Sequence, residues 1–510
     1  MIGKNILAYL PVNLAAILTS FGTIAILTRI LDGAEFGRYA LAVVAIQFVH
    51  MSFLTWVEAA LSRYQARAER EGNINTHLKT VFAYTALCSV IGVIVILATL
   101  WLLPISDLMK TILGFALTST CIQVFFNLSI EAHKASHRIL RYSFSHTSYM
   151  LLSFSVGIAL ILLTPLREVA PFIGIFVANF VILAFEIPFF LKRMKGGVIE
   201  HARAKKYFLY GMPLCFSLVL SYALSSADIF IIKALMGDMA VGQYNAGYNL
   251  ANRSLDVVFL WLGTAILPLI VTTFEDKGVA ETQEILKQYG TAILWITLPA
   301  ATGIALVSEQ AGFIIGESVR DKAVMIMPYI AFAALMNGFI AYYIQRAFVL
   351  SGHTGMFAIC LIPPTLLNLV LNFALIPTFG LMGAVYATLA AYSLGLLISF
   401  IVARRYFPIP MPVRAFCEVS ATCAFMAFAV ITLPLPQNLP MAGLFFLKSI
   451  IGGCVYAAVC YTFNVVNCRV IIKEVLIKLK TRNTDRETET ETETETETET
   501  DISLTAEVIS

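Results

Sequence analysis

Long apolar segments separated by short polar ones run through most of the chain. A helix needs about 20 mostly apolar residues to cross the hydrocarbon layer of a membrane. Fourteen segments meet that length, at about 5–30, 35–61, 79–103, 107–132, 139–164, 169–191, 207–236, 240–273, 289–311, 323–349, 354–377, 382–403, 414–435 and 441–466. The longest polar connections, at 62–78, 192–206 and 274–288, are too short for a soluble domain. The pattern predicts an all-α integral membrane protein with about 14 transmembrane helices.

Composition and charge agree with this prediction and add an orientation. Of the 510 residues, 59% are hydrophobic and 13% are charged, whereas soluble domains are about half apolar and a quarter charged. The net charge of +3 combines −9 on residues 485–510 with +12 on the rest of the chain. Of the 35 Lys and Arg residues, 26 lie on the N-terminal side of the predicted helices and 7 on the opposite side. Because cytoplasmic loops are enriched in Lys and Arg, we expect both termini in the cytoplasm.

A short pattern recurs after about 205 residues, where Gly37-x-Tyr39 has a counterpart in Gly242-x-Tyr244. Six predicted helices separate the two copies, so both copies have the same orientation. Transporters use such parallel repeats to rock two halves around a central cavity. We therefore expect two parallel six-helix lobes related by pseudo-two-fold symmetry, with two C-terminal helices and a cytoplasmic tail added. The expected boundaries are 1–200, 201–406, 407–468 and 469–510.

The predicted helix at 240–273 carries polar side chains on a single face. Polar groups are costly inside a membrane unless they face protein or water. A lone Arg at the centre of a helix costs about 3 kcal/mol on insertion scales, so we expect this face to line a water-filled cavity. The alternative is a self-satisfied patch in which Asp256 neutralises Arg253 against a neighbouring helix. Steps of four, three and four connect the candidate residues Asn245, Asn249, Asn252 and Asp256, and Arg253 lies one turn from both Asn249 and Asp256.

Five more polar residues are candidates for substrate or ion contacts. Asn368 and Asn372 share a face of the helix at 354–377, where they either line a cavity or hydrogen-bond a neighbouring helix. Asp228 lies about one turn from Lys233 and is either a cavity carboxylate that couples transport to an ion or a partner of that lysine. Arg29 and Lys233 are repeat-related bases on the side where positive charge is scarce. They either contact substrate or extend to the membrane surface.

Signatures of nucleotide, metal and cofactor binding are missing from the sequence. The chain contains neither the G-x-x-x-x-G-K-[ST] pattern that cradles phosphates nor the H-E-x-x-H pattern that binds zinc. No feature indicates a nucleic-acid partner. We expect a transporter rather than an enzyme, with no cofactor and no metal. Its energy source would be an ion gradient, the membrane potential or the gradient of the substrate itself.

Three segments resemble the polysaccharide-biosynthesis flippases, the O-antigen and lipid-linked oligosaccharide translocases of the multidrug/oligosaccharidyl-lipid/polysaccharide exporter superfamily. The motif that is similar to their helix 11–12 signature is Asn368-x-x-x-Asn372-x-x-x-x-Pro377-x-x-Gly380-x-x-Gly383-Ala384-x-x-Ala387-Thr388. The motif that resembles their first loop is Thr28-Arg29-Ile30-Leu31-x-x-x-Glu35-Phe36-Gly37-Arg38-Tyr39. A third set of residues resembles the opening of their second lobe, namely Tyr210-Gly211-x-Pro213, Asp228 and Gly242-x-Tyr244. The likeness extends to about residue 470.

The resemblance implies a flippase of the bacterial inner membrane. It would move an oligosaccharide linked to undecaprenyl diphosphate from the cytoplasmic to the periplasmic leaflet by alternating access, for O-antigen, lipopolysaccharide or other surface polysaccharide. Family members place arginines in the central cavity; Arg29 matches such a position, whereas Lys233 in the second lobe does not offer the planar bidentate grip of an arginine. Expected partners are the lipid-linked oligosaccharide, the bilayer and a glycan polymerase or glycosyltransferases of the same pathway.

Two other functions stay open. A cation-coupled multidrug exporter of the same superfamily would favour carboxylates over arginines in its cavity. A membrane glycan polymerase or ligase would present a sizeable extracytoplasmic loop, whereas the outside connections here are short and the one at 434–440 contains three prolines.

The C-terminal tail contains seven Glu-Thr repeats between Glu487 and Thr500. Like charges at every second position repel one another and leave no apolar face, so we expect disorder. A repeat expansion without a role is favoured over docking on the basic cytoplasmic rim or on a partner. Truncation after about Thr484 is expected to leave transport intact.

Overall fold

Helices make up nearly all of the chain that the structure describes. This computed structural model describes residues 2–434, 436 and 438–470, so the tail expected at 469–510, with its Glu-Thr repeat, lies almost wholly outside the described residues. Within them, 14 helical segments are long and apolar enough to cross a membrane. The predicted fold class, an all-α multi-pass membrane protein with about 14 transmembrane helices, is confirmed.

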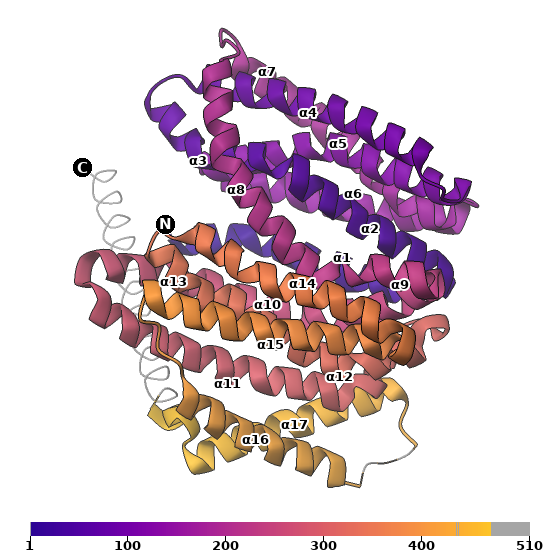
Figure 1. The fold of residues 1–510 in the computed structure, drawn as a ribbon, viewed down its shortest axis with the longest axis vertical. Coiled ribbons are helices and arrows are strands. Elements are labelled where there is room, and N and C mark those ends of the chain that lie inside the picture. The colour runs from indigo at the N-terminus through magenta and orange to yellow at the C-terminus, as the bar shows by residue number, and fades with distance from the viewer. Residues whose placement is uncertain (1, 435, 437, 471–510) are drawn as a thin grey trace, which may run out of the picture.

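The helices form two lobes and a C-terminal pair (Figure 1). The first lobe contains α1 (Ile2–Ile30), α2 (Gly33–Phe53), α3 (Thr55–Arg70), α4 (Ile74–Leu102), α5 (Asp107–Ala135), α6 (Ile139–Leu163) and α7 (Ala170–Met194). The second lobe contains α8 (His201–Ser226), α9 (Asp228–Met236), α10 (Asp238–Lys277), α11 (Val279–Ala311), α12 (Glu317–Phe339), α13 (Gln345–Leu350), α14 (Thr354–Phe379) and α15 (Leu381–Tyr406). The pair α16 (Val413–Thr432) and α17 (Met441–Phe463) packs against α11.

Three of the predicted spans are interrupted helices. The span that begins α2 breaks at Leu54 and continues as α3, and the span that begins α8 breaks at Ala227 and continues as α9. A π-helical turn at Ile340–Ile344 joins α12 to α13. Such turns and breaks let one membrane crossing change direction where it packs against two neighbours.

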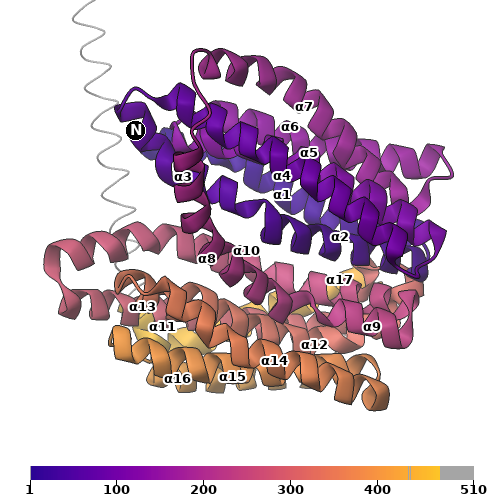
Figure 2. The same cartoon turned by 45° about the horizontal axis from the view of Figure 1, so that its top comes forward.

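The polar connection expected at 274–288 is helical apart from Gly278, and it forms the tip of the hairpin of α10 and α11. Gly278 alone separates the two helices, and its φ of +82° belongs to the left-handed region that favours glycine. With 40 and 33 residues, the helices are about 60 and 50 Å long, well beyond the ~30 Å of a hydrocarbon layer. The hairpin extends beyond the neighbouring helices at its tip (Figure 2), and helices of this length place their charged ends outside a hydrocarbon layer.

Helix α8 joins the lobes and packs on both of them. Its first half lies on α3, where a Cβ on Gly211 would stand 2.6 Å from the Cβ of Trp56 and the rings of Tyr64 and Tyr207 stack 4.9 Å apart. Its second half packs against α14. The boundary expected near residue 200 therefore stays a prediction. We call the end of the molecule that carries the α3–α4 turn the basic end, and the opposite end, where α1 meets α2, the far end.

Candidate functional site

The two lobes are in backbone contact at the far end, where α2 packs along α10. A Cβ on Gly37 would lie 1.9 Å from the carbonyl oxygen of Asp238, and a Cβ on Gly242 would lie 2.1 Å from the carbonyl oxygen of Gly33. Both separations are far below van der Waals contact, so only glycine fits. Gly37 and Gly242 are the repeat-related glycines of the sequence. Gly37 contacts Asp238, four residues before Gly242, and Gly242 contacts Gly33, four residues before Gly37. The contact therefore has the pseudo-two-fold symmetry of the lobes.

Hydrogen bonds and ion pairs extend this closed contact. The Arg29 guanidinium donates to the carbonyl of Phe313 at 2.6 Å, and the Gly316 N–H donates to the Thr28 hydroxyl at 2.9 Å. Lys233 pairs with Asp238 and not with Asp228. Arg29 and Lys233, both predicted to contact substrate, thus lie at the far-end closure in this conformation, and their role in binding stays a prediction.

Arg38 connects the lobes through two carboxylates that the sequence did not single out. Its guanidinium lies 2.7 Å from Glu168 of the first lobe and 3.8 Å from Asp238 of the second. Glu168 is 3% exposed, so this pair is shielded from solvent on the carboxylate side. Arg38 therefore forms one ion pair within the first lobe, with Glu168, and a longer one across the closure, with Asp238.

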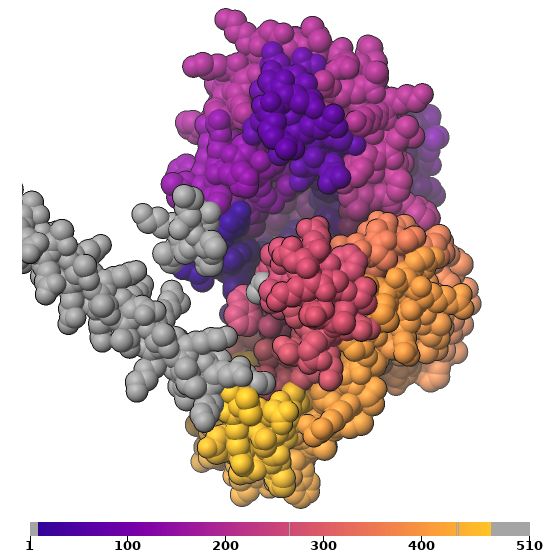
Figure 3. All heavy atoms as spheres, turned by 90° about the vertical axis from the view of Figure 1, so that its left-hand side faces the viewer, coloured from indigo at the N-terminus to yellow at the C-terminus, as the bar shows by residue number. Residues whose placement is uncertain are grey.

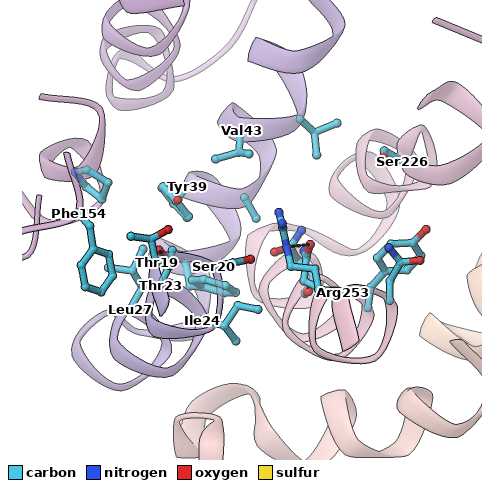
Figure 4. A pocket seen from close by; sticks show the side chains of 18 of the residues that line it. Thr19, Ser20, Thr23, Ile24, Leu27, Tyr39, Val43, Phe154, Ser226 and Arg253 are labelled. Carbon is cyan, nitrogen blue, oxygen red and sulfur yellow. Dashed lines mark hydrogen bonds between the residues drawn. The ribbon is translucent and has the colours of Figure 1, made fainter. Parts of the chain in front are cut away.

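A cavity of about 660 Å³ lies between the lobes, below the far-end closure. Helices α1, α2, α6 and α7 form its first-lobe wall, and α8, α9, α10 and α12 form its second-lobe wall. Figure 4 shows Thr19, Ser20 and Thr23 of α1 on one side and Arg253 of α10 on the other. The whole predicted stripe of α10 lines this cavity, namely Asn245, Asn249, Asn252, Arg253 and Asp256, and Asn337 of α12 joins it.

Arg253 is the charged centre of the second-lobe wall. Its side chain is exposed to the cavity, and its Nε donates to the Asn249 amide oxygen at 3.3 Å. In the described part of the chain, no carboxylate oxygen lies within 4.0 Å of the guanidinium. Asp256 instead accepts a hydrogen bond from the Asn252 amide at 2.6 Å. The guanidinium therefore retains donors that can bind an anionic group.

The first-lobe wall is uncharged and rich in hydroxyl groups. Thr19 and Thr23 donate to backbone carbonyls of their own helix, at 2.8 and 2.6 Å, which leaves their oxygens free to accept. Tyr39 and Phe154 add aromatic surface. Viewed from the basic end, the lobes are separated by a hollow (Figure 3). The cavity is thus closed at the far end, while the lobes stand apart at the basic end.

A second group of polar side chains is buried inside the second lobe. Asp228, only 1% exposed, accepts hydrogen bonds from the Tyr244 hydroxyl and from the N–H of Ile229. Helix α9, which carries Asp228, packs against α14 and α15. The buried side-chain atoms on those two helices that have no hydrogen-bond partner among the described residues are Asn368 Nδ2, Asn372 Oδ1, Thr388 Oγ1, the Tyr392 hydroxyl and Ser399 Oγ. We call Asp228, Asn368, Asn372, Thr388 and Tyr392 the buried polar group.

The structure thus distributes the predicted residues over three places. The five residues of α10 share the cavity, Asp228 with Asn368 and Asn372 belongs to the buried polar group, and Arg29 with Lys233 lies at the far end. Sequence reasoning missed Thr19, Ser20 and Thr23, although hydroxyls one turn apart in an apolar segment are a readable signal. Of the tyrosines that line the cavity, Tyr39 and Tyr244 were visible in the sequence only as members of the repeat, and Tyr149, Tyr222 and Tyr248 resemble ordinary core residues.

Comparisons with known proteins bear on family and fold. The sequence model of the family described as polysaccharide biosynthesis protein matches residues 2–274. No curated protein sequence matches the chain significantly. The fold is similar to that of a lipid II flippase, MurJ, in an inward closed conformation, with 15% identity and a TM-score of 0.74 over 90% of this chain and 98% of that one.

Two other transporters, both of the MOP superfamily, have similar folds. One is an inward-facing MATE family multidrug resistance transporter of the MOP superfamily, with 14% identity and a TM-score of 0.60 over 75% of this chain and 94% of that one. The other is a MOP superfamily transporter from Pyrococcus furiosus, with 15% identity and a TM-score of 0.56 over 78% and 96%. At such identities the likeness establishes the two-lobed fold.

Proposed function

The chain belongs to the polysaccharide biosynthesis protein family, and from that premise we propose that it is a flippase for a lipid-linked oligosaccharide. Its substrate would be an oligosaccharide on undecaprenyl diphosphate, moved from the cytoplasmic to the periplasmic leaflet of a bacterial inner membrane. The observation that carries the proposal is Arg253, a cavity arginine without a carboxylate partner within 4.0 Å among the described residues.

The chemistry of the cavity suits the two polar parts of such a substrate. A guanidinium binds phosphate oxygens through two parallel N–H donors, so Arg253 would hold the diphosphate. Amides of Asn245 and Asn249 and the hydroxyls of Thr19 and Thr23 line the rest of the cavity, where they would hydrogen-bond sugar hydroxyls. The lipid tail would stay in the bilayer, between the lobes.

The charge distribution supports the direction of transport. Cytoplasmic loops are enriched in Lys and Arg, which supports a cytoplasmic location of the basic end and of both termini. The far-end closure then faces the periplasm, and the conformation described is one that loads substrate from the cytoplasmic side. Rocking of the lobes would open the far end and release the oligosaccharide outside, where a glycan polymerase of the pathway would take it over.

We assign coupling to the buried polar group. Asp228 has no basic partner among the described residues, and a buried carboxylate is stable only when hydrogen-bonded, protonated or neutralised by a cation. Its hydrogen bond to Tyr244 connects it to the cavity, because Tyr244 also lines the cavity wall. A proton or small cation that binds Asp228 would change the charge of the second lobe, and this change would favour one position of the lobe over the other.

Transport assays with Arg253→Ala test the proposal directly. Loss of a charge-assisted bidentate contact is worth about 1.5–3 kcal/mol, so flipping of a lipid-linked oligosaccharide in reconstituted vesicles should fall about 10- to 100-fold. Arg405→Ala, an exposed arginine at the end of α15, is the matched control. Unchanged flipping by Arg253→Ala would remove this residue from the mechanism.

Two further readouts separate the other candidate functions. Asp256 is a cavity carboxylate and favours a cationic substrate, so drug hypersensitivity of a deletion strain with normal surface glycan would indicate a multidrug exporter. Exported but unpolymerised oligosaccharide units in that strain would indicate a polymerase. Retention of the lipid-linked units on the cytoplasmic side would agree with the flippase.

A further inference from the structure

The positive charge of the basic end is concentrated on one lobe. Seven Lys and Arg side chains at the basic end of α3, α5, α7 and α8 are exposed and, among the described residues, have no carboxylate within 4.0 Å. We call these seven residues the rim: Arg63, Arg70, Arg138, Lys192, Lys195, Lys205 and Lys206. Three further bases at this end, Arg67, Arg193 and Arg203, are paired with carboxylates and are therefore not counted in the rim.

The acidic residues around the rim are occupied by those three bases. Arg193 lies 2.9 Å from Glu69, Arg67 lies 2.5 Å from Glu71, and Arg203 lies 2.8 Å from Glu200. Burial raises the pKa of Glu69, but hydrogen bonds from Ser136 and Arg193 outweigh it and hold the pKa below its usual range. The carboxylates of Glu69, Glu71 and Glu200 are thus already paired, so they leave the seven positive charges of the rim uncompensated.

Within the part of the chain that the structure describes, the second lobe has no comparable surface at the basic end. The α10–α11 hairpin and the end of α15 expose four bases, Lys277, Lys287, Arg404 and Arg405. They also expose four acids, Glu275, Asp276, Glu281 and Glu284. The two sets cancel. Membrane topology requires bases on the cytoplasmic side of both lobes but does not explain why only one lobe keeps them uncompensated.

An anion of matching size is present in the same chain. The Glu-Thr repeat from Glu487 to Thr500 carries seven carboxylates, with Asp485 and Asp501 next to it. The last described residue, Val470, follows α17 at the basic end. From there, 17 residues lead to Glu487 and span up to about 56 Å when extended. That reach exceeds twice the ~24 Å radius of gyration expected for a chain of this length, so the repeat can reach any part of the basic end.

We propose that the rim is the binding site of the Glu-Thr repeat of the same chain, and that the bound repeat competes with the anionic headgroup of the substrate at the cavity entrance. Helices α3 and α8, which carry four of the seven rim residues, pack against each other beside the hollow in Figure 3. Because the repeat and the rim belong to one chain, their binding is intramolecular, and effective concentrations of linked sites reach the millimolar range, so a modest ionic affinity suffices. The competition between the repeat and the substrate headgroup rests on the proposed function, whereas the binding of the repeat to the rim does not.

A fluorescent peptide of seven Glu-Thr repeats tests the binding in nanodiscs of phosphatidylcholine. The peptide should bind saturably to a chain truncated after Thr484, and at least 10-fold more weakly to the full chain, whose own repeat occupies the rim. Binding should fall at least 10-fold between 50 mM and 500 mM NaCl because salt screens exposed charges. A Gln-Thr peptide of the same length should not bind.

Two sets of substitutions locate the site. Arg63→Gln, Arg70→Gln, Lys205→Gln and Lys206→Gln together should abolish binding to the truncated chain. The matched control is Lys277→Gln, Lys287→Gln, Arg404→Gln and Arg405→Gln on the second lobe, which should change the affinity less than two-fold. A full chain in which all seven glutamates of the repeat are glutamine alters no membrane residue and should bind the peptide as the truncated chain does.

Several results would overturn the proposal. Equal binding to the truncated and full chains would show that the tethered repeat does not occupy the rim. Binding that survives the rim substitutions would place the repeat elsewhere, for instance on the bases between Lys473 and Arg486. Complete loss of binding when ~30% phosphatidylglycerol is added would assign the rim to anionic lipid. If transport proves absent but peptide binding follows the pattern above, only the flippase assignment fails.

Discussion

Replacement of Gly242 by alanine should shift the protein toward a conformation with the far end open. The new Cβ would lie 2.1 Å from the Gly33 carbonyl oxygen, whereas ordinary contact begins near 3.4 Å. Helices α2 and α10 would have to separate by about 1.3 Å, and both obstructing groups are backbone, which cannot rotate away. Such overpacking costs about 1–3 kcal/mol, and it is absent once the lobes part. The equilibrium should therefore shift about 5- to 150-fold toward the open far end.

Cysteine accessibility measures this shift. Thr23→Cys places a thiol in the cavity wall, and a membrane-impermeant maleimide added from the periplasmic side should label it at least 10-fold faster in Gly242→Ala than in the parent. Gly37→Ala should act alike, because its Cβ would lie 1.9 Å from the Asp238 carbonyl oxygen. Gly303→Ala is the control, since nothing lies within 4 Å of its Cβ. Labelling of Gly242→Ala at the rate of Gly303→Ala would refute the reasoning.

Three more outcomes are expected. Arg38→Ala leaves the Glu168 carboxylate buried without its partner, which costs about 3–5 kcal/mol; thermal unfolding should show a large fall in stability that Arg38→Ala with Glu168→Gln mostly recovers. Because the pKa of Glu69 is held below its usual value, its contribution to stability is present above its unfolded pKa and is lost as the pH falls through the folded pKa. The unfolding midpoint should therefore fall on acidification, and less so in Glu69→Gln. Asp228→Asn can keep the hydrogen bond from Tyr244 and should fold normally, but flipping in vesicles should no longer respond to an imposed ion gradient; a full response would exclude Asp228 from coupling.

The number and place of the membrane helices could be predicted because the bilayer imposes a simple length and polarity rule. The face of α10 that lines the cavity could be predicted for a related reason, since an arginine inside a membrane needs water or a partner. Helix ends outside the bilayer obey no such rule. The α10–α11 hairpin therefore continues as helix through the charged residues that connect the two predicted spans, which the length rule does not foresee.

The far-end contacts could not be predicted in the same way. The recurrence of Gly37 and Gly242 was visible in the sequence, but that each glycine meets the backbone of the other repeat depends on how two lobes dock. The same holds for Arg29 and Lys233, whose spacing indicates a repeat and says nothing of whether the bases face a cavity or a closure. A local sequence pattern indicates whether a residue faces lipid, water or protein. It does not indicate which residue about 200 positions away will pack against it.

The unpaired guanidinium of Arg253 has a kinetic consequence for an empty carrier. Sealing the cavity at both ends without substrate would leave this charge in a dry, low-dielectric space, at a cost of about 3 kcal/mol on insertion scales. That cost slows the passage of the empty carrier through its occluded state by a factor of about 150. The diphosphate of the proposed substrate would neutralise the guanidinium and remove this cost, so the loaded carrier would pass the occluded state without the delay. One unpartnered arginine would then suppress idle turnover and preserve the ion gradient between cargoes.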